Sequence, residues 1–199
     1  MKRWLILFVV GCLALAGVAN AAVQQGDTEL DALGAWMSQD GSGDAALSTD
    51  FDMLFLMGRV GYFLTDNIQV AGVGMGAWTE TSIDIDSGEE GVSGDVDVDI
   101  YGLGAAGEYH LIPTNQWVPY VGAQVLWLDV DIDASDLLGS DGDADGDGVL
   151  WGPVAGLRYE LNAYNDFFVE YQYHMWEGDI DDIFDDGHAL FVGLVHQFK

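Results

Sequence analysis

Apolar and polar residues alternate along much of the chain after residue 26, a period that is typical of β-strands with two different faces. In one such stretch, apolar Phe167, Val169 and Tyr171 alternate with polar Glu170 and Gln172. The pattern predicts eight strands, at residues 27–37, 51–64, 68–80, 98–111, 117–130, 149–161, 167–176 and 188–198.

The connections between these strands alternate strictly between short and long. Short turns are expected at 65–67, 112–116 and 162–166, and long segments rich in Asp, Gly and Ser at 38–49, 82–97, 131–148 and 177–187. This rhythm favours an antiparallel up-and-down barrel with small turns at one end and large loops at the other. No apolar run after residue 22 reaches the roughly 18 residues of a membrane helix, so a membrane form requires a closed barrel.

The two strand faces predict which side of the wall meets lipid. The polar face is interleaved with Gly and Ala, which suits the crowded interior of a small barrel. Aromatic residues gather near the long segments and again near the short turns, as in the two interfacial girdles of a membrane barrel. They are Trp36, Trp78, Trp127, Trp151 and Trp176, and Phe63, Tyr109, Trp117 and Phe167. The alternative is a soluble secreted β-protein with aromatic residues in its core.

The first 21 residues have the anatomy of a secretory signal. A basic start at Lys2 and Arg3 precedes an apolar run and a small-x-small site that ends at Ala21. A lipobox ending at Cys12 is the alternative, but the apolar run continues to Val18. We therefore expect residues 1–21 to be removed and residues 22–199 to form the barrel domain. Cleavage there removes the cysteine, so disulfides and cysteine catalysis are not expected.

The acidic residues are expected to be separated from the hydrophobic ones along the chain. The whole chain has a formal net charge of −29, and the expected mature part carries only Arg59, Arg158 and Lys199 against 34 acidic residues. Such a surface repels nucleic acid and attracts divalent cations or basic partners. Since half of the residues are hydrophobic, we expect an ordered protein in which the acids are concentrated in the long loops.

Two segments resemble the family of eight-stranded outer-membrane β-barrels related to the OmpA transmembrane domain and OmpX. "GYFLTDNIQV" is similar to the family's second hairpin, and "ALFVGLVHQFK" resembles its C-terminal assembly signal, although His196 and Lys199 depart from that pattern. The resemblance implies an all-β transmembrane barrel in the cell outer membrane. It also implies contact with the lipid bilayer and lipopolysaccharide, insertion by the outer-membrane assembly machinery, and a monomer.

The few charged residues of the polar strand faces predict a site in the lumen. With the facing given above, the side chains that point inward near the short turns are Arg59, Glu108, Arg158, Glu160 and Glu170. Both arginines then lie opposite acids, which favours a structural ion-pair network that fills the narrow interior. The alternative is a gate in a small ion or solute channel.

The loop segment "SDGDADGDGVLWG" begins like a calcium-binding loop of the EF-hand kind. Asp141, Asp143 and Asp145 alternate as hard oxygen ligands, and Asp147 could add a fourth. Position twelve is Gly152 in place of a bidentate Glu, so a complete EF-hand is excluded. The remaining alternatives are weak Ca²⁺ binding and a merely hydrated loop. No other cofactor is expected.

Catalytic chemistry has little support in the pattern. The serines of the expected mature chain lie in loops or at their margins, and no strand offers a Ser beside a His. His174 and His188 flank the last acidic segment, where Asp179 or Asp181 could join them. We expect a structural or surface-interaction protein that is not an enzyme. The alternatives are a small channel and, less favoured, a lipid-modifying barrel enzyme.

Overall fold

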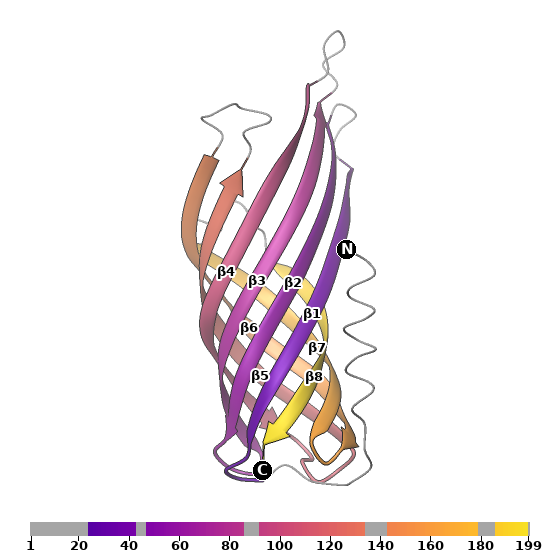
Figure 1. The fold of residues 1–199 in the computed structure, drawn as a ribbon, viewed down its shortest axis with the longest axis vertical. Helices are drawn as coiled ribbons and strands as arrows, with labels where there is room; N and C mark the ends of the chain where they lie inside the picture. Colours follow the sequence, from indigo (N-terminus) through magenta and orange to yellow (C-terminus); the bar gives the residue numbers. More distant parts are fainter. Residues whose placement is uncertain (1–23, 43–46, 86–91, 134–142, 179–185, 199) are drawn as a thin grey trace.

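A computed structural model describes residues 24–42, 47–85, 92–133, 143–178 and 186–198 (Figure 1). Eight antiparallel strands form one closed barrel in which each strand pairs with its neighbours in the sequence and the last pairs with the first. The strands are β1 (Thr28–Ser42), β2 (Leu47–Phe63), β3 (Ile68–Ile85), β4 (Val92–His110), β5 (Trp117–Asp133), β6 (Asp143–Asn162), β7 (Asn165–Gly178) and β8 (Gly187–Phe198). The predicted fold is confirmed.

The short connections lie at one end of the barrel, called here the turn end, and the opposite end is the loop end (Figure 1). In the turn between β2 and β3, the Thr65 hydroxyl accepts hydrogen bonds from the amides of Asn67 and Ile68, which fixes a tight reversal. Within the described residues, no helix is long and apolar enough to cross a membrane.

The ladder that closes the barrel is shorter than the others. β1 pairs with β2 over fifteen residues, but with β8 over only seven, from Thr28 opposite Phe198 to Gly34 opposite Val192. These seven pairs lie at the turn end of both strands. Above Gly34, β1 continues to Ser42 with β2 as its only paired neighbour in the described structure.

The strands run further toward the loop end than predicted. β5 and β6 remain paired from Trp127 opposite Val149 up to Asp133 opposite Asp143, inside the segment predicted as a loop. The reason lies in the sequence, because the acids of these extensions alternate with aliphatic residues that point inward. Val130 is buried, whereas Asp129 and Asp131 on either side are exposed. A strand whose outer face meets water carries Asp where a lipid-facing strand carries Leu.

The interior of the barrel is divided into two zones. Toward the loop end, large apolar side chains from several strands pack into one contiguous core. We call the following six residues the apolar layer: Phe55, Met75, Ile100, Leu126, Leu150 and Phe191. Toward the turn end, the inward positions are mostly polar or charged, for example Glu29, Arg59 and Glu108. β7 departs from this division, because its inward positions stay polar from Glu170 to His174.

Candidate functional site

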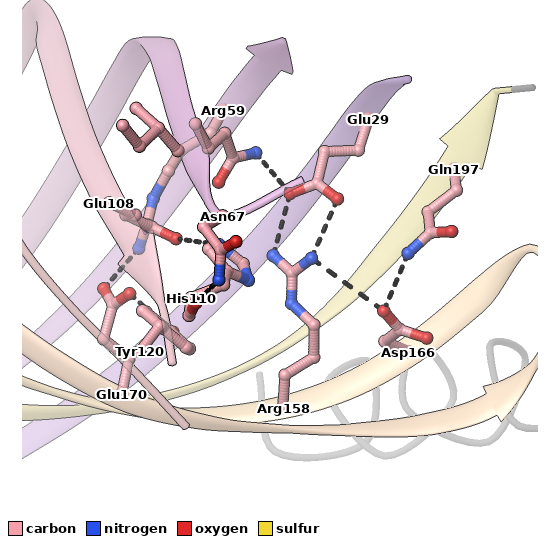
Figure 2. A network of polar contacts seen from close by, with 12 residues as sticks. Glu29, Arg59, Asn67, Glu108, His110, Tyr120, Arg158, Asp166, Glu170 and Gln197 are labelled. Carbon is pink, nitrogen blue, oxygen red and sulfur yellow. Dashed lines mark hydrogen bonds and ion pairs between the residues drawn. The ribbon is translucent and has the colours of Figure 1, made fainter. Parts of the chain in front are cut away.

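The turn-end zone contains two clusters of buried charge, each centred on an arginine (Figure 2). In the Arg59 cluster, the guanidinium of Arg59 contacts Glu108 on β4, with Nη1 at 2.5 Å from Oε1, and Glu170 on β7. The Tyr120 hydroxyl on β5 donates a hydrogen bond of 2.7 Å to the second carboxylate oxygen of Glu170. Charge-assisted bonds of this kind are among the strongest polar contacts in proteins.

The Arg158 cluster lies on the other side of the interior. Arg158 on β6 donates two hydrogen bonds, of 2.9 and 2.8 Å, to the two carboxylate oxygens of Glu29 on β1. Gln69 on β3 donates to the same carboxylate. An oxygen of Asp166 lies 3.9 Å from Arg158 and accepts a 3.0 Å hydrogen bond from Gln197 on β8. Glu29 and Gln197 are neighbours across the short β1–β8 ladder, which we call the seam of the barrel, so this cluster spans the seam.

Tyr120 brings the two clusters together. Its hydroxyl belongs to the Arg59 cluster, while its ring lies 5.9 Å from the guanidinium carbon of Arg158. The ring of His110 stacks on the ring of Tyr120, at 5.5 Å between centroids. Together the clusters draw at least one side chain from each of the eight strands. The arrangement therefore fastens the turn ends of all strands to one another through the lumen.

Carboxylates outnumber cations in this zone. Glu29, Asp31, Glu108, Asp166 and Glu170 are all buried, and all of them except Asp31 form ion pairs with one of the two arginines. Several buried polar atoms have no hydrogen-bond partner within the described structure, among them one oxygen each of Asp31 and Asp166. Buried polar atoms of this kind are usually satisfied by ordered water. The turn-end zone is therefore a polar interior in which acids outnumber arginines.

The structure brings together four of the five lumen residues that the sequence indicated. Arg59, Glu108 and Glu170 share one cluster, and Arg158 anchors the other. Glu160 lies half-buried at the turn end of β6, opposite Asp166 at a point where the β6–β7 ladder is irregular, and belongs to neither cluster as defined above.

Several residues of the turn-end zone are absent from the sequence-based prediction of the site. Glu29 and Asp31 alternate with Leu30 and Ala32, so the period of two already placed both acids on the inner face. The sequence predicts Asp166 to be part of a turn, yet β7 begins at Asn165. Tyr120 gave no such signal, because an inward tyrosine and a girdle tyrosine look alike in a sequence.

The structure changes the picture of the Asp-rich segment. β6 begins at Asp143, six residues before the predicted strand start, so Asp145 and Asp147 lie on an extended strand and are exposed. They pair with Asp131 and Asp129 across the ladder. Asp141 lies outside the described residues. Across the described residues, no group of three or more acidic, His or Cys side chains could hold a metal ion. Calcium binding by the segment remains a prediction.

Two of the residues assigned to aromatic girdles lie inside the barrel instead. Trp176 packs against the apolar core and Phe63 is fully buried, edge-on to His110. Their inward facing follows from strand parity, which places each of them an even number of residues from an inward neighbour. The other predicted girdle residues with described side chains are exposed: Trp78, Trp127, Trp151, Tyr109, Trp117 and Phe167. The side chain of Trp36 lies outside the described structure.

The two histidines considered for catalysis face opposite sides of the wall. His174 is buried and its Nε2 lies 2.8 Å from the Gln172 side-chain oxygen, whereas His188 is exposed and contacts the Tyr171 hydroxyl. The acids Asp179 and Asp181 lie outside the described residues. Because one side chain points into the barrel and the other points outward, His174 and His188 cannot act on the same reacting group.

Comparison with known proteins agrees with this architecture. The family model described as an outer membrane protein beta-barrel domain matches residues 8–198. In fold, the chain is similar to the outer membrane protein OprG from Pseudomonas aeruginosa, with a TM-score of 0.59 and 14% identity over 89% of this chain and 98% of that one.

Two further structures share the fold. The N-terminal β-barrel domain of OprF from Pseudomonas aeruginosa has a TM-score of 0.53 and 16% identity, covering 88% of this chain and 99% of that chain. Neisserial surface protein A has a TM-score of 0.52 and 17% identity, covering 86% and 96%. No curated protein matches the chain in sequence.

Proposed function

Because the chain belongs to the outer membrane protein beta-barrel domain family, we propose that it is a closed barrel with a structural and surface-interaction role, and neither an open pore nor an enzyme. Its place is the cell outer membrane, where the barrel is embedded in the lipid bilayer. The observation that carries the proposal is the filled interior, in which the apolar layer and the two arginine clusters lie one above the other.

The outer wall supports a passive membrane anchor. Leu103 is 73% exposed, Trp127 63% and Leu190 61%, and all three belong on a lipid-facing surface. The histidine pair that could have served catalysis is divided between the two faces of the wall. We further propose that the protein is inserted by the outer-membrane assembly machinery through its C-terminal strand and acts as a monomer.

The loop end supports the surface-interaction part of the proposal. Asp129 faces Asp147 and Asp131 faces Asp145 across the β5–β6 ladder, and all four are exposed. Like charges in directly opposed positions destabilise a sheet unless they are screened. Both arginines of the expected mature chain are buried in the lumen, so neither neutralises this surface. We propose that divalent cations screen these acids and bridge them to the phosphates of lipopolysaccharide.

A small channel is the second candidate, favoured by the surplus of carboxylates and the unpartnered polar atoms in the turn-end zone. Wild-type protein in planar bilayers separates the two. We expect no steady conductance, with the folded state verified by heat-modifiable migration on gels. A steady wild-type conductance would overturn the closed barrel and favour the channel. Protein that shows no heat-dependent shift and remains in the soluble fraction would contradict the membrane barrel itself.

A further inference from the structure

The two zones of the lumen differ in how costly it is for an ion to pass through them. In the turn-end zone, an entering cation meets buried carboxylates and polar atoms that lack protein partners, such as an oxygen of Asp31. These groups can replace part of the water that the ion loses. The two arginines occupy this zone, but each is held to acids by hydrogen bonds.

The apolar layer offers no such replacement. Phe55, Ile100, Leu126, Leu150 and Phe191 are each at most 1% exposed, and they come from five different strands. The rings of Phe55 and Phe191 meet edge-to-face in the lumen, with centroids 6.2 Å apart. Transferring an unpaired charge into a dry apolar environment is far more costly than passing polar groups, and hydrophobic constrictions close channels by excluding water.

From this difference we propose that the apolar layer is the permeability barrier of the barrel, and that the arginine clusters hold the turn ends of the strands together without being the barrier. The inference rests on the proposed closed barrel and names the side chains that close it. It also assigns an ion preference. Once the layer is opened, the path leads through an interior in which five carboxylates surround two guanidinium groups, so it selects cations over anions.

His174 on β7 lies against aromatic rings of the apolar layer. Its ring lies 6.4 Å from that of Phe55, 6.2 Å from that of Phe191 and 6.0 Å from that of Trp176, and its nitrogen contacts Gln172. The chain of polar side chains that rises from Glu170 through Gln172 therefore ends against aromatic rings. This contact marks the level at which the polar path stops.

Conductance of three double variants in planar bilayers tests the assignment. Phe55→Ser with Phe191→Ser makes the layer polar, and Arg59→Gln with Glu170→Gln breaks the ion pair of one cluster while removing both charges. The matched control is Leu103→Ser with Leu190→Ser, which places the same polar group on the lipid-facing side. Heat-modifiable migration verifies folding, and the reversal potential in a salt gradient measures ion preference.

We expect the layer variant to conduct at least about tenfold more than the control, with a cation-selective reversal potential, while the cluster variant stays closed. A folded layer variant that is no more conductive than the control would overturn the inference, as would a cluster variant that conducts while the layer variant stays closed. If the double variant does not fold, Leu126→Ser alone takes its place with Leu103→Ser as control. Steady conductance of the wild type would instead refute the closed barrel on which the inference rests.

Discussion

At the scale of single residues, the interior depends on small side chains placed opposite large ones. Gly156 on β6 lies directly across the ladder from Tyr120, and a Cβ at Gly156 would collide with the phenol ring. The missing side chain gives the ring room to lie across the lumen and reach Glu170. The glycine is needed for its small size, and its backbone conformation is an ordinary one.

Gly156→Ala should therefore lower the free energy of unfolding by about 2 kcal/mol or more, because the displaced ring loses its bond to a buried carboxylate and crowds its neighbours. Urea titration of the refolded barrel in lipid vesicles, followed by tryptophan fluorescence, measures the change. The control is Gly72→Ala, at an exposed position where an added Cβ meets nothing within 4 Å. Equal losses for the two variants would contradict the role assigned to Gly156.

Arg158 provides the second residue-scale prediction. Its replacement by Met leaves Glu29 buried without its guanidinium partner, so the unfolding free energy should fall by about 3–5 kcal/mol. The double variant Arg158→Met with Glu29→Gln should recover much of the loss, since the buried charge is then removed as well. The same titration checks both, with the exposed Glu177→Gln as control. A double variant no more stable than Arg158→Met would show that the pair contributes more than charge balance.

At the scale of elements, the strands extend beyond the apolar band as paired acidic ladders. The opposed aspartates of β5 and β6 repel one another at low ionic strength. Asp145→Asn with Asp147→Asn should raise the unfolding free energy by roughly 0.5–1 kcal/mol in dilute buffer, and the gain should vanish near 1 M salt, where the Debye length is about 3 Å. Thermal melts at the two salt concentrations provide the measurement. A gain that persists in high salt would point to a cause other than repulsion.

Calorimetric titration with Ca²⁺ tests whether the acidic extension of β6 binds this cation. We expect weak heat of binding in the wild type and less in Asp143→Asn with Asp145→Asn, because fewer carboxylates remain on the β6 extension. The titration is repeated with Mg²⁺ to separate a calcium preference from general screening. Identical traces for the wild type and the variant would leave only a hydrated acidic surface.

Sequence periodicity predicted the elements better than their ends. All eight strands and three short turns follow from the period of two and the turn residues, because the alternation of faces is a local property that can be read along each strand without knowing its partners. The sequence does not show where the strands end on the loop side. A strand extension whose outer face meets water is rich in Asp, and so is a surface loop, so residue content does not distinguish them. Lumen partners were found where an arginine faced an acid, as at Arg59 and Glu108. Contacts such as that of Gln69 with Glu29 depend on which strands face each other across the interior. Periodicity along one strand does not reveal this arrangement.

At the scale of the whole molecule, exposed aromatic residues lie toward both ends of the barrel, where we expect them to meet the two interfaces of the bilayer. Trp127 and Trp151 lie outward toward the loop end and Trp117 outward toward the turn end, whereas Trp176 packs inside. In single-tryptophan variants reconstituted with brominated lipid, fluorescence of Trp127 should be quenched strongly and that of Trp176 weakly, because bromine quenches on contact. A Trp176 quenched as strongly as Trp127 would contradict its inward position.

The short seam between β1 and β8 also leads us to expect a particular order of events when the barrel forms. β1 and β8 are the ends of the sheet and the strands most distant in sequence, so their meeting carries the largest loss of chain entropy and comes late. Only seven residue pairs form at that moment, and Glu29 meets Arg158 in the same step, because the Arg158 cluster bridges the seam. We therefore expect closure to come late, with the Arg158–Glu29 ion pair forming together with the β1–β8 ladder. Before that step the edges of β1 and β8 are unpaired, and we expect this open form to be the one most prone to pairing with another chain.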